Sequence, residues 1–265
     1  MNKKIAIIGG GNLGTAIAEG LIQSGFVSPK HILITKRNIH TLHELERRGV
    51  LISDKNEEAI RYADLVILAV KPFQVNEILV SLKNEFRPDS QVLVSVVTGI
   101  SIDHITGYLG SRVPVVRAMP NTAIAIQESM TCVAAQHVSE EHLQYVLDIF
   151  NSLGRAVKID EKLMDAATVL GACGTAFAMR YIRANIQGGI EIGFDAATAN
   201  LIAAQTVKGA AQLLLTKGTH PEQEIDKVTT PKGCTIAGLN EMEHRGFSSS
   251  LIKGLVASYD KIAKD

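Results

Sequence analysis

The stretch KIAIIGGGNLGTAI, Lys4 to Ile17, decides the fold of this chain. A short aliphatic run leads directly into glycines spaced as Gly9-x-Gly11-x-x-Gly14, and a helix-like segment follows. Glycines at these positions permit a tight turn, close approach of the backbone to a pyrophosphate, and close packing of helix on strand. The free N–H groups at the helix start favour phosphate charge. The stretch therefore predicts a dinucleotide-binding strand, turn and helix.

The same alternation of short aliphatic runs and amphipathic segments continues to about Ile159. Strands read as continuous apolar runs when helices cover both faces of their sheet. We therefore predict an α/β fold, with a Rossmann-type, doubly wound and mostly parallel sheet in residues 1–160. The expected strands are KIAIIG, HILIT, LVILAV, QVLVSVV, VPVVRAM, MTCVAA and AVKI.

After Asp160 the pattern changes to long alanine-rich segments without a convincing strand. An all-helical second domain is expected over residues 161–265, with helices near 162–192, 196–216, 235–244 and 248–264. The segment Ala196–Thr216 is apolar nearly all the way round, and Lys208 is its only charge. Because such a helix must be buried on several sides, this segment predicts burial against another subunit.

Bulk composition narrows the classes of partner. The formal net charge is zero, tryptophan is absent and aromatics make up 5% of the chain. These values argue against binding of nucleic acid or of an anionic membrane. No transmembrane span or signal peptide is expected. The three cysteines are far apart and form no CxxC pair, and the histidines lack ligand spacing, so we expect reduced thiols, no metal site and a cytoplasmic location.

The end of the second predicted strand favours one dinucleotide. NAD enzymes usually carry Asp or Glu there, to accept a hydrogen bond from the ribose 2′-hydroxyl. This chain has the sequence ITKRN, which offers Thr35, Lys36 and Arg37 and no carboxylate. A hydroxyl and two cations suit a 2′-phosphate, so NADP(H) is the preferred cofactor and NAD(H) is possible. The alternative is that both cations are solvated loop charges.

The stretch AVKP follows another predicted strand and contains Ala69, Val70, Lys71 and Pro72. Open α/β sheets bind ligands at the carboxyl ends of their strands, so these residues are candidates for contact with the cofactor. The spacing leaves it open whether Lys71 lies beside the cofactor or is an ordinary exposed lysine.

Together with later motifs, these pieces resemble the pyrroline-5-carboxylate reductase family. The matching stretches are GGGNLGTAI, LAVKP, SVVTGISI, VVRAMPNT and TTPKGCTIAGLNEMEHRGF. The first two fit many Rossmann reductases, whereas RAMPNT and the last stretch are more specific. The resemblance implies NAD(P)H-dependent reduction of the ring imine of 1-pyrroline-5-carboxylate to L-proline, the last step of proline biosynthesis. It also implies a helical domain that interlocks into homodimers, with larger assemblies of dimers.

The resemblance further implies the residues of the site. Cofactor contacts would come from Gly9, Asn12, Leu13, Gly14, Thr35, Asn56, Ala69, Lys71 and Pro72. Substrate contacts would come from Met119, Pro120, Asn121, Gly233, Cys234 and Thr235. Thr235 maps onto the family's proposed proton donor or hydrogen-bond partner of the imine. Because a cyclic imine is easily protonated, one hydroxyl near the nitrogen is enough to orient the ring.

Three departures from the family pattern bear on the substrate. The family's Gly-Ser-Gly-Pro-Ala is replaced by Ala172-Cys173-Gly174-Thr175-Ala176, its usual MPNTP by MPNTA, and a loop glycine by Lys232. A positive φ is harder to adopt at Lys232 than at glycine. Another cyclic imino acid is therefore an alternative substrate.

Two other functions compete with this interpretation. A reductase of the β-hydroxyacid dehydrogenase type would carry a catalytic lysine on the first long helix of the second domain, but no lysine occurs between Lys162 and Lys208. A non-catalytic NADP-binding paralogue is the other alternative. Cys173 and Cys234 are interpreted as packing residues, and Arg117 as a structural arginine more readily than as a substrate clamp.

Overall fold

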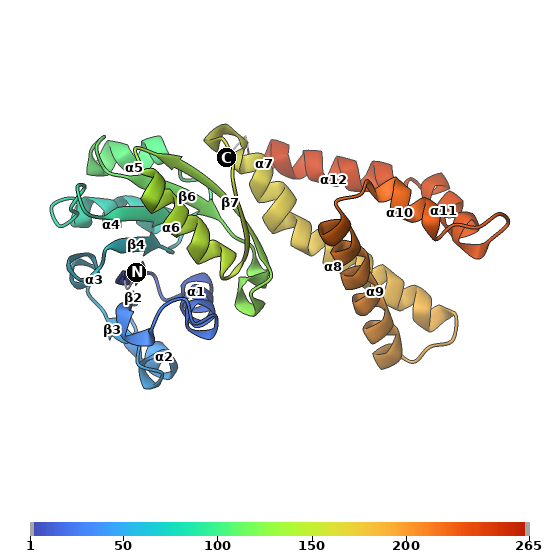
Figure 1. Cartoon of the computed structure of the whole chain (residues 1–265), viewed down its shortest axis with the longest axis horizontal. Coiled ribbons are helices and arrows are strands. Elements are labelled where there is room, and N and C mark those ends of the chain that lie inside the picture. The colour runs from blue at the N-terminus through green and yellow to red at the C-terminus, as the bar shows by residue number, and fades with distance from the viewer. Residues whose placement is uncertain (1–2, 263–265) are drawn as a thin grey trace. The chain divides into compact units, whose positions relative to one another are not determined.

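The computed structural model describes residues 3–262 and divides the chain into two compact units. The first unit ends at Ala172 and the second begins at Cys173. Figure 1 labels the elements of both. The domain boundary was predicted near Asp160, and residues 161–172 lie within the first compact unit.

The first unit contains one sheet with the strand order β3-β2-β1-β4-β5-β6-β7-β8. Neighbouring strands from β3 to β6 run parallel, β7 is antiparallel to β6, and β8 is parallel to β7. The mostly parallel, doubly wound sheet is thus confirmed. The strands are β1 (Ile5–Ile8), β2 (Ile32–Thr35), β3 (Leu51–Ser53), β4 (Leu65–Leu68), β5 (Val92–Ser95), β6 (Val115–Met119), β7 (Ser129–Gln136) and β8 (Gly154–Lys158).

The short strand β3 was not predicted. Its burial changes from exposed at Leu51 to buried at Ser53, and it lies at the edge of the sheet. An edge strand of this kind lacks the continuous apolar run by which the central strands are recognised. Pairing with β2 therefore decides its conformation more than its own sequence does.

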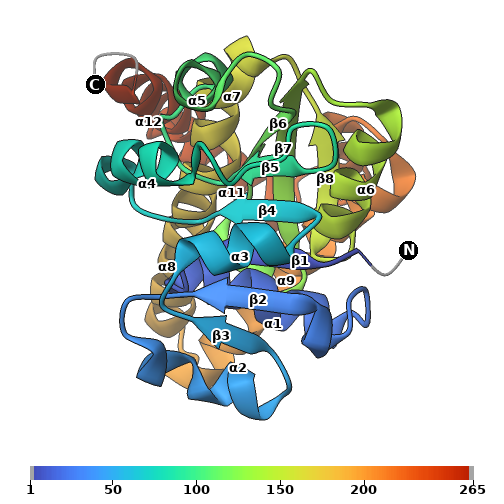
Figure 2. The ribbon, with the colours of Figure 1, turned by 90° about the vertical axis from the view of Figure 1, so that its left-hand side faces the viewer.

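Helices cover both faces of the sheet. Alternate residues of β1 belong to different apolar clusters: Ile5 and Ile7 pack with residues of α1, α2 and α6, and Ala6 and Ile8 with residues of α3, α4 and α5. Figure 2 shows α3 on one face of the sheet, in front of it and between β4 and β2. These helices are α1 (Asn12–Gln23), α2 (His43–Arg47), α3 (Asn56–Tyr62), α4 (Val75–Leu82), α5 (Ile102–Leu109) and α6 (Glu140–Asn151).

The strand order places a switch point beside β1. The chain leaves β1 toward β2 on one side, and β4 pairs with β1 on the other. Loops that follow parallel strands emerge at the same edge of a sheet, and ligands of open α/β folds bind where the strand order reverses. The loops after β1, β2, β4 and β6 therefore share the edge at which a cofactor is expected.

A helical segment joins the sheet to the end of the first unit. It consists of a 3₁₀ turn at Glu161–Leu163, α7 (Met164–Ala167) and a π-helix at Thr168–Cys173. The hydroxyl of Thr168 donates to the carbonyl of Met164 over 2.8 Å. Such a bond competes with the regular ladder and bends a helix. The predicted continuous helix near 162–192 is therefore interrupted.

The second unit is all-helical over its described residues, as predicted. Only Ile186, Ala199 and Ala203 among these residues are buried apolar side chains. No helix in residues 3–262 is long and apolar enough to cross a membrane. The helices are α8 (Gly174–Glu191), α9 (Ala196–Lys217), α10 (Pro221–Lys227), which was not predicted, α11 (Cys234–His244) and α12 (Phe247–Ile262).

Candidate active site

The glycine loop after β1 has the geometry of a phosphate cradle. Gly9 has a φ of +108°, and a Cβ there would overlap the carbonyl of Ala69. A Cβ on Gly14 would overlap the carbonyl of Gly9, whereas nothing lies within 4 Å of the corresponding point on Gly11. Gly9 thus permits the turn, Gly14 permits the packing of α1, and Gly11 leaves open space where a phosphate could approach.

The start of α1 offers unsatisfied backbone donors to that space. Its N-cap is Gly11, which has no side chain to cap the helix, and the first turn carries no acidic residue. The leading N–H groups belong to Asn12, Leu13 and Gly14. Free N–H groups and the helix dipole together favour an anion. The residues of the loop therefore fit the diphosphate of a dinucleotide.

Thr35, at the end of β2, forms hydrogen bonds to the backbone of this loop. Its carbonyl accepts hydrogen bonds from the backbone nitrogens of Gly9 at 3.2 Å and Gly10 at 2.7 Å. Its side chain is buried, and its hydroxyl donates to Oδ1 of Asn56 over 2.6 Å. Because that oxygen accepts, the amide nitrogen of Asn56 faces elsewhere and remains a donor for a ligand.

The two cations after Thr35 differ in exposure. Lys36 is half-buried and Arg37 is exposed, and neither forms an ion pair with another described residue. The carboxyl of Glu58, in α3, has partners of its own. A hydrogen bond from Ser53 lowers the pKa of that carboxyl, and Lys55 lies 3.5 Å from it. Both cations are therefore available to an anion.

The loop after β4 lies against the glycine loop. The backbone nitrogen of Ala69 donates to the carbonyl of Ile8 over 2.8 Å. Lys71 is exposed, and its own backbone nitrogen donates to Oε1 of Gln74 over 3.3 Å, which holds the turn at Pro72. Ala69, Val70 and Lys71 consequently line the edge at the switch point, and the Lys71 side chain is not used in the described fold.

The end of β6 brings the first group of predicted substrate residues to the same edge. Met119 and Pro120 are buried, and Asn121 is half-buried. The backbone nitrogen of Asn121 donates to the Ser129 hydroxyl over 3.1 Å, and its side-chain oxygen accepts from the backbone nitrogen of Ala123 over 3.0 Å. The 3₁₀ helix Thr122–Ile126 that follows packs on α1. The cofactor residues and Met119–Asn121 therefore share one edge of one sheet.

The second group of predicted substrate residues lies in the other compact unit, at the start of α11. Gly233 is the N-cap and offers no side-chain cap, while Cys234 and Thr235 are exposed in the first turn. The backbone nitrogen of Gly233 donates to the carbonyl of Thr230 over 2.9 Å and closes a turn through Pro231 and Lys232. The hydroxyl of Thr235 and the first N–H groups of α11 are thus presented on the surface of this unit.

Lys232 adopts a conformation that glycine adopts more readily than other residues. Its φ is +60°. Pro231 fixes a negative φ one residue earlier, so the turn is of type II, which requires a positive φ at its third residue. The expected difficulty of a positive φ at Lys232 does not change the turn; the chain instead accepts a strained residue there.

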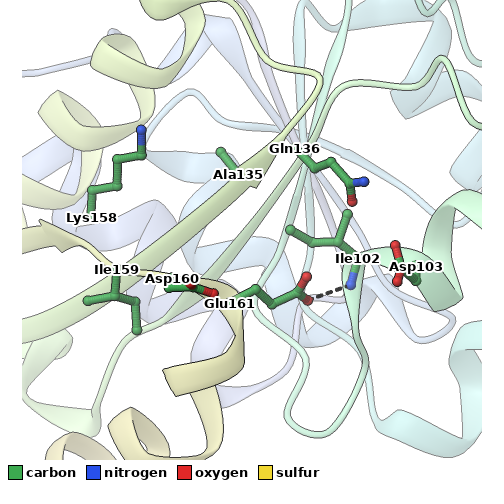
Figure 3. Close-up of a pocket in the computed structure, with 8 residues that line it drawn as sticks. All are labelled: Ile102, Asp103, Ala135, Gln136, Lys158, Ile159, Asp160 and Glu161. Carbon is green, nitrogen blue, oxygen red and sulfur yellow. Dashed lines mark hydrogen bonds between the residues drawn. The ribbon is translucent and has the colours of Figure 1, made fainter.

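A separate polar pocket lies near the start of α5 (Figure 3). The side chain of Glu161 accepts a hydrogen bond from the backbone nitrogen of Ile102 over 2.7 Å. None of the predicted site residues lines this pocket. It is lined by Ile102, Asp103, Ala135, Gln136, Lys158, Ile159, Asp160 and Glu161.

Comparison with known proteins decides the family. Residues 161–265 match a family model described as pyrroline-5-carboxylate reductase dimerisation, and residues 4–99 match one described as NADP oxidoreductase, coenzyme F420-dependent. Pyrroline-5-carboxylate reductase 2 of Dictyostelium discoideum is 45% identical over 99% of this chain and 93% of its own length. The chain belongs to the pyrroline-5-carboxylate reductase family.

Two further family members extend the comparison. Pyrroline-5-carboxylate reductase 1 of Dictyostelium discoideum is 48% identical over 98% of this chain, and the chain spans 49% of that relative's length. The crystal structure of Plasmodium falciparum pyrroline carboxylate reductase, which has NADP bound, covers 98% of this chain and 97% of its own with 27% identity and a TM-score of 0.86. The fold of the family is therefore present over essentially the whole chain.

The residue pattern gave little information about the surroundings of Arg117. The residue is 5% exposed, and its guanidinium lies 3.6 Å from Glu161 and 3.4 Å from Asp165. These two ion pairs support the interpretation of Arg117 as a structural arginine. The two carboxylate partners were not predicted. They lie in the helical segment after β8, and their spacing in the sequence gives no sign of contact with β6.

The family departure at Ala172–Ala176 coincides with the end of the π-helix and the start of α8. A proline at position 175 would lack a backbone N–H inside a run that is helical from Thr168 to Glu191. The threonine found there therefore keeps a backbone N–H, which a proline would lack, close to the point where the π-helix passes into α8.

Proposed function

We propose that this protein reduces the ring C=N bond of 1-pyrroline-5-carboxylate to give L-proline. The observation that carries the proposal is a dinucleotide cradle at the switch point of the sheet, in a chain that aligns with pyrroline-5-carboxylate reductases over nearly its full length. In such a site, bound NADPH supplies a hydride to the electrophilic imine carbon. The protein supplies binding, orientation and a hydrogen bond to the nitrogen.

The preference for NADPH over NADH rests on the end of β2. Thr35 directs its hydroxyl to Asn56, while Lys36 and Arg37 follow with no ion-pair partner among the described residues. No carboxylate stands at the strand end to accept from a ribose 2′-hydroxyl. Two cations and the Asn56 amide instead match a 2′-phosphate, because charge-assisted hydrogen bonds are the stronger class.

On the substrate side, we assign the imine hydrogen bond to Thr235 and the carboxylate to the first N–H groups of α11. The exposed hydroxyl of Thr235 and the side-chain-free N-cap Gly233 support this assignment. A hydroxyl can donate to the lone pair that forms on the nitrogen when a hydride adds to the protonated imine, and free N–H groups at a helix start suit a carboxylate. Met119, Pro120 and Asn121 are assigned to the substrate side of the first unit.

Association through the second unit is part of the proposal. The match to a family dimerisation model, together with exposed apolar side chains on α8, α9 and α12, supports a homodimer formed by these helices. Larger assemblies of dimers are a further expectation of the family. The three free cysteines support a reducing, cytoplasmic setting.

The deciding experiment is a steady-state assay of NADPH oxidation with 1-pyrroline-5-carboxylate, with proline identified as the product. Turnover is expected with this imine, and a six-membered cyclic imino acid serves as the competing substrate. A hydroxyacid substrate is disfavoured because α8 contains no lysine to act as acid or base. Cofactor binding without turnover of either imine would instead identify a non-catalytic NADP-binding protein.

The role of Thr235 is tested by a matched pair. Thr235→Val keeps the shape of the side chain and removes the hydroxyl, while Thr235→Ser keeps the hydroxyl. We expect the valine variant to lose about 10- to 100-fold in kcat and the serine variant to stay within about threefold of wild type. Equal kcat values in the two variants would remove the hydroxyl from the mechanism.

The cofactor preference is tested at Lys36 and Arg37. Changing both to Ala should raise the Kd for NADPH about 100-fold and leave the Kd for NADH within about threefold, because each charged hydrogen bond to the 2′-phosphate contributes about 1.5 kcal/mol. Arg155 and Lys158, two exposed cations of β8, provide the control pair. Equal losses for both cofactors would show that the cations do not recognise the 2′-phosphate.

A further inference from the structure

Two side chains, one inside β6 and one just beyond it, contact the helical segment 161–171. Arg117, inside β6, forms ion pairs with Glu161 and with Asp165. Asn121, just beyond β6, donates from Nδ2 to the carbonyl oxygen of Gly171 over 3.2 Å. All of these residues belong to the first compact unit.

The Arg117 contacts are built into the core of the unit. The residue is flanked in the sheet by Ser95 of β5 and Ala134 of β7. Its side chain is 6% exposed, whereas Glu161 and Asp165 retain 28% and 45% of their side-chain exposure. A buried guanidinium requires paired carboxylates, so its burial holds the 3₁₀ turn and α7 against the sheet.

The amide of Asn121 has a single possible orientation. Its Oδ1 accepts from the backbone nitrogen of Ala123, which is a donor, and its Nδ2 donates to the carbonyl of Gly171, which is an acceptor. Exchanging the two atoms would break both bonds, so the hydrogen-bond network fixes the assignment. Two of the amide's polar groups are therefore used within the protein.

Gly171 lies in the π-helix Thr168–Cys173. A π-helix is rare, and it is found frequently at functional sites because a wide turn departs from the regular α-helical ladder. Thr168 and Val169 of this turn are buried, while Gly171 is half-buried beside Asn121. The π-helix thus has a buried start, where Thr168 bonds to Met164, and a half-buried part, where Asn121 bonds to Gly171.

The same asparagine is also tied to the cofactor helix. The 3₁₀ helix that it caps ends at Ile126, and the side-chain amide of the C-cap Gln127 donates to the carbonyl of Gly20 in α1 over 3.2 Å. The start of α1 forms the phosphate cradle. Asn121 therefore stands at one junction of three parts of the first unit: β6, α1 through the 3₁₀ helix, and the π-helix.

We propose that Asn121 is a positioning residue for turnover, which acts by holding the π-helix Thr168–Cys173 in register with the end of β6. The proposal rests on the proposed function, because Met119–Asn121 are assigned there to the substrate side. Loss of the Asn121–Gly171 bond lets the wide turn shift relative to Met119 and Pro120. NADPH binding, which uses the loops after β1, β2 and β4, is not affected.

The charge-free test is Asn121→Ser. Serine is a good N-cap and still accepts from the backbone nitrogen of Ala123, but it is too short to reach Gly171. We expect kcat to fall about 100-fold, as a displacement of about 1 Å can cause, with KM for NADPH within about threefold of wild type. Amide hydrogen exchange in residues 168–175 should be faster in the free protein.

The matched control is Asn151→Ser. Asn151, in α6, also uses its Oδ1 to accept a backbone N–H, that of Ala156 at 2.8 Å, but it makes no bond to the π-helix. This variant should leave kcat and the exchange of residues 168–175 unchanged. If Asn121→Ser matches the control in both measurements, Asn121 does not position the π-helix.

The variant Asn121→Asp adds a measurement, the pH dependence of kcat, that a general loss of packing would not change. A carboxylate cannot donate to Gly171, but its protonated form can, and an ordinary aspartate has a pKa of about 3.9. The ratio of kcat between this variant and wild type should therefore rise at least about twofold between pH 8 and pH 5, and the difference in exchange between variant and wild type in residues 168–175 should become smaller at the lower pH. A ratio and an exchange difference that do not change with pH would contradict the role of the donated bond.

The two proposals fail in different ways. If the wild-type protein does not turn over 1-pyrroline-5-carboxylate, the proposed function is wrong, and the hydrogen-exchange measurements on the free protein still test the Asn121–Gly171 contact. If wild type turns over and Asn121→Ser does so equally well, the proposed function stands and the positioning role is wrong.

Discussion

The first unit buries both faces of its sheet within the chain, whereas the second unit buries only Ile186, Ala199 and Ala203 among its described apolar side chains. Large side chains such as Leu201 and Ile252 stay exposed on the helices of the second unit, at 68% and 60%. Exposed apolar patches of this kind mark interaction surfaces. One unit therefore closes its own core, and the other presents a surface that suits a partner chain.

The largest expected effect concerns the self-contained unit. In Gly14→Ala the new Cβ would overlap the Gly9 carbonyl, which is rigid backbone. We expect the free energy of unfolding of the first unit to fall by about 4 kcal/mol or more, together with loss of NADPH binding. Chemical denaturation and calorimetric titration measure the two effects.

Gly11→Ala is the matched control, because nothing lies within 4 Å of its Cβ position. Stability should change by less than about 1 kcal/mol, while the Kd for NADPH should rise about 100-fold as the methyl group fills the phosphate space. Unchanged NADPH binding in Gly11→Ala would show that the diphosphate does not approach this loop.

The second prediction compares a buried isoleucine with an exposed one. Ile67, in β4, is 0% exposed, and Ile67→Ala should reduce the free energy of unfolding by about 2–5 kcal/mol at every protein concentration. Ile252→Ala should act only through association, so its loss of Tm should grow on dilution. Thermal unfolding at two protein concentrations separates them, and a concentration-dependent loss in Ile67→Ala would break the contrast between the units.

The third prediction concerns association itself. Leu201→Glu places a charge on α9 at a position 68% exposed, and Val80→Glu does the same on α4 at a position 61% exposed. We expect the first to weaken dimer formation about 100-fold, because an unpaired charge would be desolvated in the interface, and the second to have no effect. Sedimentation at several concentrations gives the dissociation constants. Dimers of equal stability would place the interface elsewhere.

The smallest effect concerns Glu224, which ties α10 to the end of α9. Hydrogen bonds from Lys227, Thr219 and Lys217 lower the pKa of Glu224 to about 2. Because the pKa is lower in the folded state than the ordinary value of 4.5, this group stabilises the second unit above about pH 4.5 and loses that contribution as the pH falls toward 2.

Glu224→Gln should therefore lower Tm at neutral pH and have less effect at about pH 3, where wild type has lost part of the contribution. Melting curves at both pH values show the difference. A gap in Tm between variant and wild type that is the same at both would mean that the ion pairs are not responsible for the stabilisation. The Ile67→Ala gap, which involves no titrating group, is the reference.

Much of the fold followed from local pattern. The central strands were predicted because continuous apolar runs such as LVILAV can only be strands covered on both faces. The glycine spacing at Gly9, Gly11 and Gly14 predicted the turn, and each glycine has a separate steric reason in the structure. By contrast, β3 and α10 were missed, since both are short and gain their conformation from neighbours.

The candidate site divides in the same way. Residues that act through their backbone or at a strand end, such as Gly14, Thr35 and Ala69, could be placed from sequence, because the parallel strands β1, β2 and β4 bring their carboxyl ends to one edge. The partners of Arg117 and Asn121 could not be predicted from residue spacing. Asp165 and Gly171 lie 48 and 50 residues away from them in the sequence, and only packing brings them together.

The sequence by itself determined the class of fold, the dinucleotide cradle and the cations that suit a 2′-phosphate, because each depends on local sterics or on residue type. Tertiary structure alone decided the bond between Asn121 and Gly171 and the burial of Arg117 beside two carboxylates. These features depend on which backbone groups lack partners once the sheet and helices have packed, and a buried polar group must then find its partner wherever the fold places one.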